Sequence, residues 1–123
     1  MSNEVPILRM GRNLMVTLQG NLEDSTVEQI ERAVTREVAR VGATGVLIDV
    51  SGLSIVDSFV ARVIARLVAM VRLLGARSTI VGLQPAVAMT LVELGVPMGH
   101  VRTALNAEQG MALLRGAGDD RID

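Results

Sequence analysis

The chain has 123 residues, of which 50% are apolar, and its 12 basic and 13 acidic side chains leave a formal net charge of −1. This length provides one domain with a substantial core, while the near-neutral charge and the single aromatic residue argue against binding to nucleic acids. The absence of cysteine and of a signal-peptide pattern at the N-terminus indicates a cytoplasmic protein without disulfide bonds.

The first predicted elements are a β-hairpin and an amphipathic helix. Residues 5–10 and 14–20 favour strands, and Gly11 suits the tight loop between them. Ser25 and Glu28 fit a capping box, which predicts that a helix begins there with Ser25 as the N-cap. Apolar residues then recur every three or four positions on one helix face. The residues of this face are Val27, Ile30, Val34, Val38 and Val41. Gly42 is predicted to end the helix.

The centre of the chain reads as a buried strand, a polar turn and a long helix. The strand covers residues 46–50, the turn residues 51–54 and the helix residues 58–74. The helix contains Arg62, Arg66 and Arg72, so we expect it to be buried within a globular domain and not to span a membrane.

The remaining chain alternates strands and helices. A strand is predicted over residues 78–83, and Pro85 suits the first position of the next helix. Residues 100–103 favour a short last strand, and Asn106 can cap a closing helix over residues 107–114.

This order predicts an α/β fold in which a single domain contains a mixed β-sheet with an N-terminal hairpin and about four helices. The domain is expected to cover residues 1–115, followed by a flexible tail over residues 116–123. The composition combines many aliphatic residues with almost no aromatic ones. Either part of this aliphatic surface is buried against other chains in an oligomer, or the protein simply has an aliphatic core; both interpretations remain open.

No pattern predicts an enzyme, a cofactor or a metal site. The only histidine, His100, has no nucleophile-elbow serine to pair with, and the acidic residues lack the spacing of metal ligands. A receiver-type aspartyl phosphate at Asp49 or Asp57 would need further acids after the first strand to hold a divalent cation. The first strands end instead in Arg-Met and Gln-Gly, so we reject that interpretation.

Ser58 is the candidate functional residue. It follows Asp57 at the predicted start of the long helix, where the helix dipole favours negative charge, so a phosphate on its hydroxyl would be well placed. Arg62 and Arg66 follow at intervals of four and lie on the same helix edge, as phosphate ligands or as the rim of a partner-binding surface. The alternatives are that Asp57, Ser58 or Ser54 merely caps the helix, and that the arginines form a solvated edge.

These residues belong to segments that resemble a known family. Ile-Asp-Val-Ser-Gly-Leu at 48–53 and Val-Asp-Ser-Phe-Val-Ala at 56–61 resemble the STAS domain (sulfate transporter and anti-sigma factor antagonist). Within that family, Gly-Ala-Arg at 75–77, Val-Gly-Leu-Gln-Pro-Ala-Val-Ala at 81–88 and Thr-Leu-Val-Glu-Leu-Gly at 90–95 resemble the RsbS-type stressosome proteins.

The resemblance implies a non-enzymatic scaffold of a stress-signalling complex. Such proteins assemble with sensor-type STAS paralogues of the RsbR type and sequester a serine/threonine kinase of the RsbT type. Phosphorylation of the serine that corresponds to Ser58 releases the kinase, and a phosphatase resets the site. The short chain is expected to be the scaffold partner, since no sensor domain precedes the STAS segment.

Two alternative functions remain. The first is an anti-sigma factor antagonist that binds an anti-sigma kinase directly. The sporulation-type antagonists have Asp-Ser-Ser-Gly at this point, whereas this chain has Phe59 and Val60 after its Asp-Ser pair, which disfavours that function. The second is a small enzyme that uses the Ser58 junction, which would require a pocket with converging polar groups.

Overall fold

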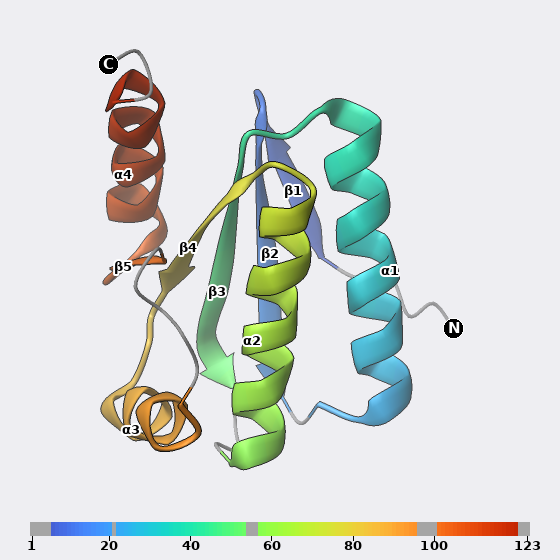
Figure 1. Ribbon diagram of the computed structural model, residues 1–123, viewed down its shortest axis with the longest axis vertical. Coiled ribbons are helices and arrows are strands. Elements are labelled where there is room, and N and C mark those ends of the chain that lie inside the picture. The colour runs from blue at the N-terminus through green and yellow to red at the C-terminus, as the bar shows by residue number, and fades with distance from the viewer. Residues whose placement is uncertain (1–5, 21, 54–56, 96–100, 121–123) are drawn as a thin grey trace.

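The computed structural model describes residues 6–20, 22–53, 57–95 and 101–120 (Figure 1). A five-stranded sheet in the order β1-β2-β3-β4-β5 forms the centre, with β1 antiparallel to β2 and the other neighbours parallel. The elements along the chain are β1 (Ile7–Met10), β2 (Asn13–Gly20), α1 (Asp24–Val41), β3 (Gly45–Leu53), α2 (Ser58–Leu73), β4 (Arg77–Val81), α3 (Pro85–Glu93), β5 (Arg102–Ala104) and α4 (Ala107–Asp120). This arrangement confirms the predicted α/β class and the mixed sheet with an N-terminal hairpin.

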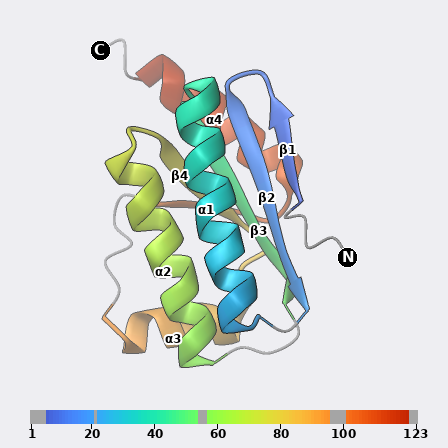
Figure 2. The ribbon, with the colours of Figure 1, turned by 90° about the vertical axis from the view of Figure 1, so that its right-hand side faces the viewer.

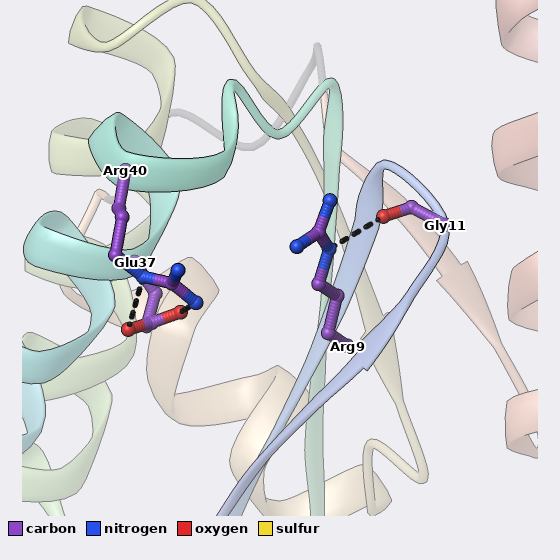
Figure 3. A network of polar contacts seen from close by, with 4 residues as sticks. All are labelled: Arg9, Gly11, Glu37 and Arg40. Carbon is purple, nitrogen blue, oxygen red and sulfur yellow. Dashed lines mark hydrogen bonds and ion pairs between the residues drawn. The ribbon is translucent and has the colours of Figure 1, made fainter.

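The hairpin between β1 and β2 closes through a two-residue turn. Met10 pairs with Asn13, and Gly11 adopts a left-handed backbone with φ of 65°, a conformation that glycine adopts without steric cost. The Arg9 guanidinium donates a hydrogen bond to the Gly11 carbonyl at 3.0 Å (Figure 3). The hairpin loop therefore forms as the glycine at this position predicts.

Helices α1 and α2 cover one face of the sheet (Figures 1 and 2). The apolar stripe predicted for α1 is buried at Val27, Ile30, Val34 and Val38, and Gly42 ends the helix in the left-handed conformation. On β3, alternate residues such as Val46 and Ile48 point into this main core. The core is aliphatic throughout, as the composition requires.

Helix α4 lies on the opposite face (Figure 1). Leu114 of this helix forms a smaller apolar cluster with Leu47 and Val81 of the sheet. Gly110 is buried in α4, and a Cβ atom there would clash with the Leu47 side chain, so glycine permits the close contact of helix and sheet. The helix starts as predicted, because the Asn106 side chain accepts a hydrogen bond from the Gln109 N–H at 2.9 Å, and it continues to Asp120.

The predicted capping box at Ser25 and Glu28 is wrong. The helix begins two residues earlier than predicted, with Glu23 as an N-cap of extended backbone and no side-chain cap hydrogen bond. The Glu23 carbonyl accepts the Val27 N–H at 2.8 Å, and Asp24 places an acid in the first turn, where the helix dipole favours it. Ser25 therefore lies inside the helix, and α1 starts without a side-chain cap.

The predicted turn at residues 51–54 is also incorrect over its described part. Strand β3 continues to Leu53, because a bulge lets Gly52 pair with Gln19 after Asp49 has paired with Thr17. Ser54 lies outside the described residues, as does His100. The bulge therefore extends the carboxyl end of β3 to Leu53, a few residues before α2 begins at Ser58.

Candidate functional site

The candidate site is the start of α2, which follows the carboxyl end of β3. In Figure 1 the first turns of α1 and α2 lie at the same end of the molecule, and α3 lies beside the start of α2 in both ribbon views. Pro85 occupies the first turn of α3, as predicted, and Val87 and Leu91 join the core against α2. The start of α2, where Ser58 lies, is therefore flanked by the start of α1 and by α3.

Asp57 is the N-cap of α2. Its backbone is extended, and its carboxylate accepts a hydrogen bond from the Val60 N–H at 3.0 Å. This bond satisfies one of the N–H groups that a helix leaves without a backbone acceptor at its start. The capping interpretation is therefore correct for Asp57, and the carboxylate is fixed at the helix end.

Ser58 is the first helical residue, and its side chain is exposed. Because Asp57 provides the cap, the Ser58 hydroxyl is not needed for it, and it hydrogen-bonds to none of the residues that the structure describes. Another protein can reach this hydroxyl without unfolding the domain. A phosphate here would add about two negative charges at the positive end of the α2 dipole, one residue from the Asp57 carboxylate.

The two arginines of the predicted row differ in their contacts. Arg62 is exposed and forms no ion pair with a residue in the described part of the chain. Arg66 makes a bidentate ion pair with Glu31 of α1, with nitrogen–oxygen distances of 2.8 and 3.1 Å. The hydrogen bond that Arg66 donates to the Glu31 carboxylate raises the pKa of Arg66. Arg62 is thus the cation one turn from Ser58, whereas Arg66 joins α2 to α1.

Two features of the site were not predicted from the sequence. They are the ion-pair partner of Arg66 and a groove that lies between α1 and α2. The Glu31 side chain is only 13% exposed, because it packs between α1 and α2 where it binds Arg66. The groove has a volume of about 350 Å³. It is lined by Asp24, Val27, Glu28, Glu31, Phe59, Arg62, Val63 and Arg66. The one feature of the sequence that could have indicated this groove is Phe59, the single aromatic residue, directly after Ser58.

Helix α3 presents apolar side chains next to the junction. Met89 is 63% exposed and Val92 is 78% exposed, and both line a shallow surface hollow together with Ala88 and Glu93. An exposed apolar patch on a small domain is typical of surfaces that bind other proteins.

Asp49, the other acid considered for phosphate chemistry, holds the β3 bulge. One of its carboxylate oxygens accepts hydrogen bonds from the Ser51 N–H at 3.0 Å and from the Ser51 hydroxyl at 2.7 Å. Across the described ranges no cluster of three or more histidine, aspartate or glutamate side chains could hold a metal ion. Asp49 therefore has an evident structural role.

The mixed sheet, the helix pair on one face and the serine at the start of α2 define a class of protein. The STAS domain family matches residues 5–106, and the chain belongs to that family. Within it, the chain is similar to RsbS of Moorella thermoacetica carrying a serine-to-glutamate substitution. The two are 33% identical with a TM-score of 0.83, over 94% of this chain and 97% of that one. This similarity confirms the RsbS-type resemblance.

The chain is also similar to a stressosome chain and to two proteins named as co-antagonists of RsbT. A chain of the stressosome, described as a signal integration and transduction hub, is 32% identical with a TM-score of 0.78, covering 92% of this chain and 98% of that one. The RsbT co-antagonist proteins RsbRA and RsbRB of Bacillus subtilis are 30% and 28% identical over 107 residues, or 86% of this chain. This chain spans 39% of the length of these two curated relatives.

The anti-sigma factor antagonist SpoIIAA shares the fold, with a TM-score of 0.73 at 18% identity. Among the described residues, none of the helices is both long and apolar enough to cross a bilayer.

Proposed function

We propose that the protein is a non-enzymatic, cytoplasmic scaffold of a stressosome-type complex, which sequesters an RsbT-type serine/threonine kinase and releases it when Ser58 is phosphorylated. The observation that carries this proposal is the exposed hydroxyl of Ser58 at the first position of α2, left free by the Asp57 cap. The relatives support the choice of partner, since the matched Bacillus proteins are named as co-antagonists of RsbT.

The release step follows from charge. The kinase is proposed to dock over Ser58 and the exposed apolar residues Met89 and Val92 of α3. Phosphorylation would add about two negative charges beside the fixed Asp57 carboxylate, and a docked interface would have to desolvate both groups. Arg62 is placed to approach the phosphate from one turn along α2 and to hold it at the surface, while Arg66 and Glu31 keep α1 and α2 together.

The partner chains are proposed from the same relatives and from the exposed surface. Leu73, at the end of α2, and Leu105, between β5 and α4, are each at least 80% exposed, which supports burial of exposed apolar residues in an oligomer with RsbR-type paralogues. A phosphatase that resets Ser58 completes the cycle. The segment proposed to assemble is the domain over residues 1–115, and α4 extends beyond it to Asp120 in place of the flexible tail predicted from residue 116.

The test is to incubate the protein with an RsbT-type kinase and ATP and to map the phosphate by mass spectrometry. Wild-type protein is expected to gain one phosphate on Ser58, and Ser58→Ala to gain none. Ser25→Ala is the matched control, because Ser25 is also an exposed serine in the first turn of a helix. Phosphate at another residue while Ser58 remains unmodified would contradict the proposal.

A further inference from the structure

The groove between α1 and α2 has an apolar floor and charged walls. Helix α1 contributes one wall through Asp24, Glu28 and Glu31, and α2 contributes the facing wall through Arg62 and Arg66. These residues recur at intervals of three or four on each helix, so each set lies on one face. The volume of about 350 Å³ is enough for one or two side chains of a binding partner.

The floor offers an anchor for an aliphatic side chain. Val27 and Val63 are buried at its base, and Phe59 is half-buried beside them, which leaves part of its ring open to the groove. A partly exposed aromatic ring in a concave apolar site is the kind of position where binding energy is concentrated in protein interfaces.

Only some of the charged side chains along the groove are paired with an opposite charge. At one end Glu31 and Arg66 neutralise each other in an ion pair. Towards the start of the helices, Asp24 and Glu28 form no ion pair within the described part of the chain, and the groove lining there includes one cation, Arg62. That open end has two carboxylates and one guanidinium group, so it complements a ligand that carries positive charge.

We propose that this groove binds a segment of another protein that presents an arginine or lysine next to an aliphatic side chain. The cation lies against the Asp24 and Glu28 carboxylates, and the aliphatic side chain packs on Phe59. A second copy of this chain that docked groove to groove around a two-fold axis would bring these carboxylates against themselves, which disfavours that occupant. The proposal does not rest on the proposed function, because it is argued from the groove residues of the unmodified protein alone.

The test uses the isotopically labelled full chain and a minimal probe, the acetylated and amidated dipeptide Leu-Arg. We expect millimolar peptide to shift the NMR signals of Val27, Phe59 and Val63 in preference to those of α4. The matched peptide Leu-citrulline has the same shape without the charge, and it is expected to bind at least about tenfold more weakly, because a charge-assisted hydrogen bond is lost. Equal binding of the two peptides, shifts elsewhere or no shifts at all would overturn the proposal.

A variant of the protein tests the contact between the peptide arginine and the Glu28 carboxylate. Glu28→Gln keeps the size of an exposed side chain and removes its charge, and it is expected to weaken Leu-Arg binding severalfold. Glu108→Gln on α4 carries the same change on the opposite face of the sheet and is expected to bind like the wild type. Equal affinity for the two variants would refute the assigned contact. Groove signals that move on dilution without peptide would show that a second copy occupies the groove, which also refutes the proposal.

Discussion

Replacing Asp57 with alanine should destabilise the domain at the point where α2 begins. The Asp57 carboxylate accepts the Val60 N–H at 3.0 Å, and alanine would leave that group without its side-chain acceptor. Loss of an N-cap costs about 1 kcal/mol, and loss of a negative charge from the helix start adds about 0.3 kcal/mol at an exposed site. We therefore expect the free energy of unfolding to fall by roughly 1 to 1.5 kcal/mol and the Tm by about 4 to 6 °C.

Two further substitutions separate the cap from the switch. Asp57→Asn keeps a capping oxygen and loses only the charge, so it should stay within about 0.5 kcal/mol of the wild type. Ser58→Ala should also be close to neutral, because Ser58 is exposed and does not cap the helix. Urea unfolding followed by circular dichroism measures all three variants. A stable Asp57→Ala variant, or an Asp57→Asn variant as unstable as the alanine one, would refute this account of the helix start.

Other substitutions test contacts further from Ser58. In a double-mutant cycle with Glu31→Gln and Arg66→Gln, the coupling energy should be small and should fall further at high salt, since the arginine is 66% exposed; a large coupling that salt does not change would contradict a surface pair. Gly82→Ala should destabilise by more than about 1 kcal/mol in chemical unfolding, because φ is +75° and a Cβ would lie 2.5 Å from a side-chain carbon of β3; wild-type stability would refute this. The Arg40 hydrogen bond lowers the pKa of Glu37 (Figure 3). Any stability from this pair is therefore present above the ordinary carboxyl pKa and is lost as the pH falls through the lowered one. An NMR titration should show the Glu37 pKa rising in Arg40→Gln, and an unchanged pKa would contradict the pairing.

Much of the fold follows from local sequence patterns. The valines and isoleucine of α1 lie on one face because they recur every three or four residues, and Gly42 ends that helix in the conformation that glycine favours. Pro85 and Asn106 mark helix starts through properties of the single residue, a fixed φ and a capping side chain. Such signals depend on few neighbours, and a sequence therefore reveals them.

The errors and omissions involve contacts between distant segments. The Ser-Gly pair at residues 51–52 was predicted as a turn, but pairing with β2 extends β3 through a bulge. Ser25 was predicted as an N-cap, but the extended backbone of Glu23 starts the helix earlier. The Glu31–Arg66 pair joins residues 35 positions apart. Neither helix alone shows that their faces meet, so the groove could not be predicted.

The residues of the candidate site stay a prediction, and the structure adds their local contacts. The sequence identified Ser58, Asp57 and the arginine row, and the structure distinguishes their contacts: a capping carboxylate, an exposed hydroxyl and an arginine paired with α1. Under the proposed function, that division would let the domain keep its helix end intact when the neighbouring hydroxyl is phosphorylated.

A calorimetric titration of the RsbT-type kinase tests most directly whether negative charge at the start of α2 controls docking. The protein is titrated as wild type, as Ser58→Asp and as Ala112→Asp, which places the same charge on an exposed position of α4 on the opposite face. The account predicts tight binding for the wild type and Ala112→Asp, and at least a tenfold weaker affinity for Ser58→Asp, or about 1.4 kcal/mol. Equal affinity of the kinase for all three proteins would contradict it.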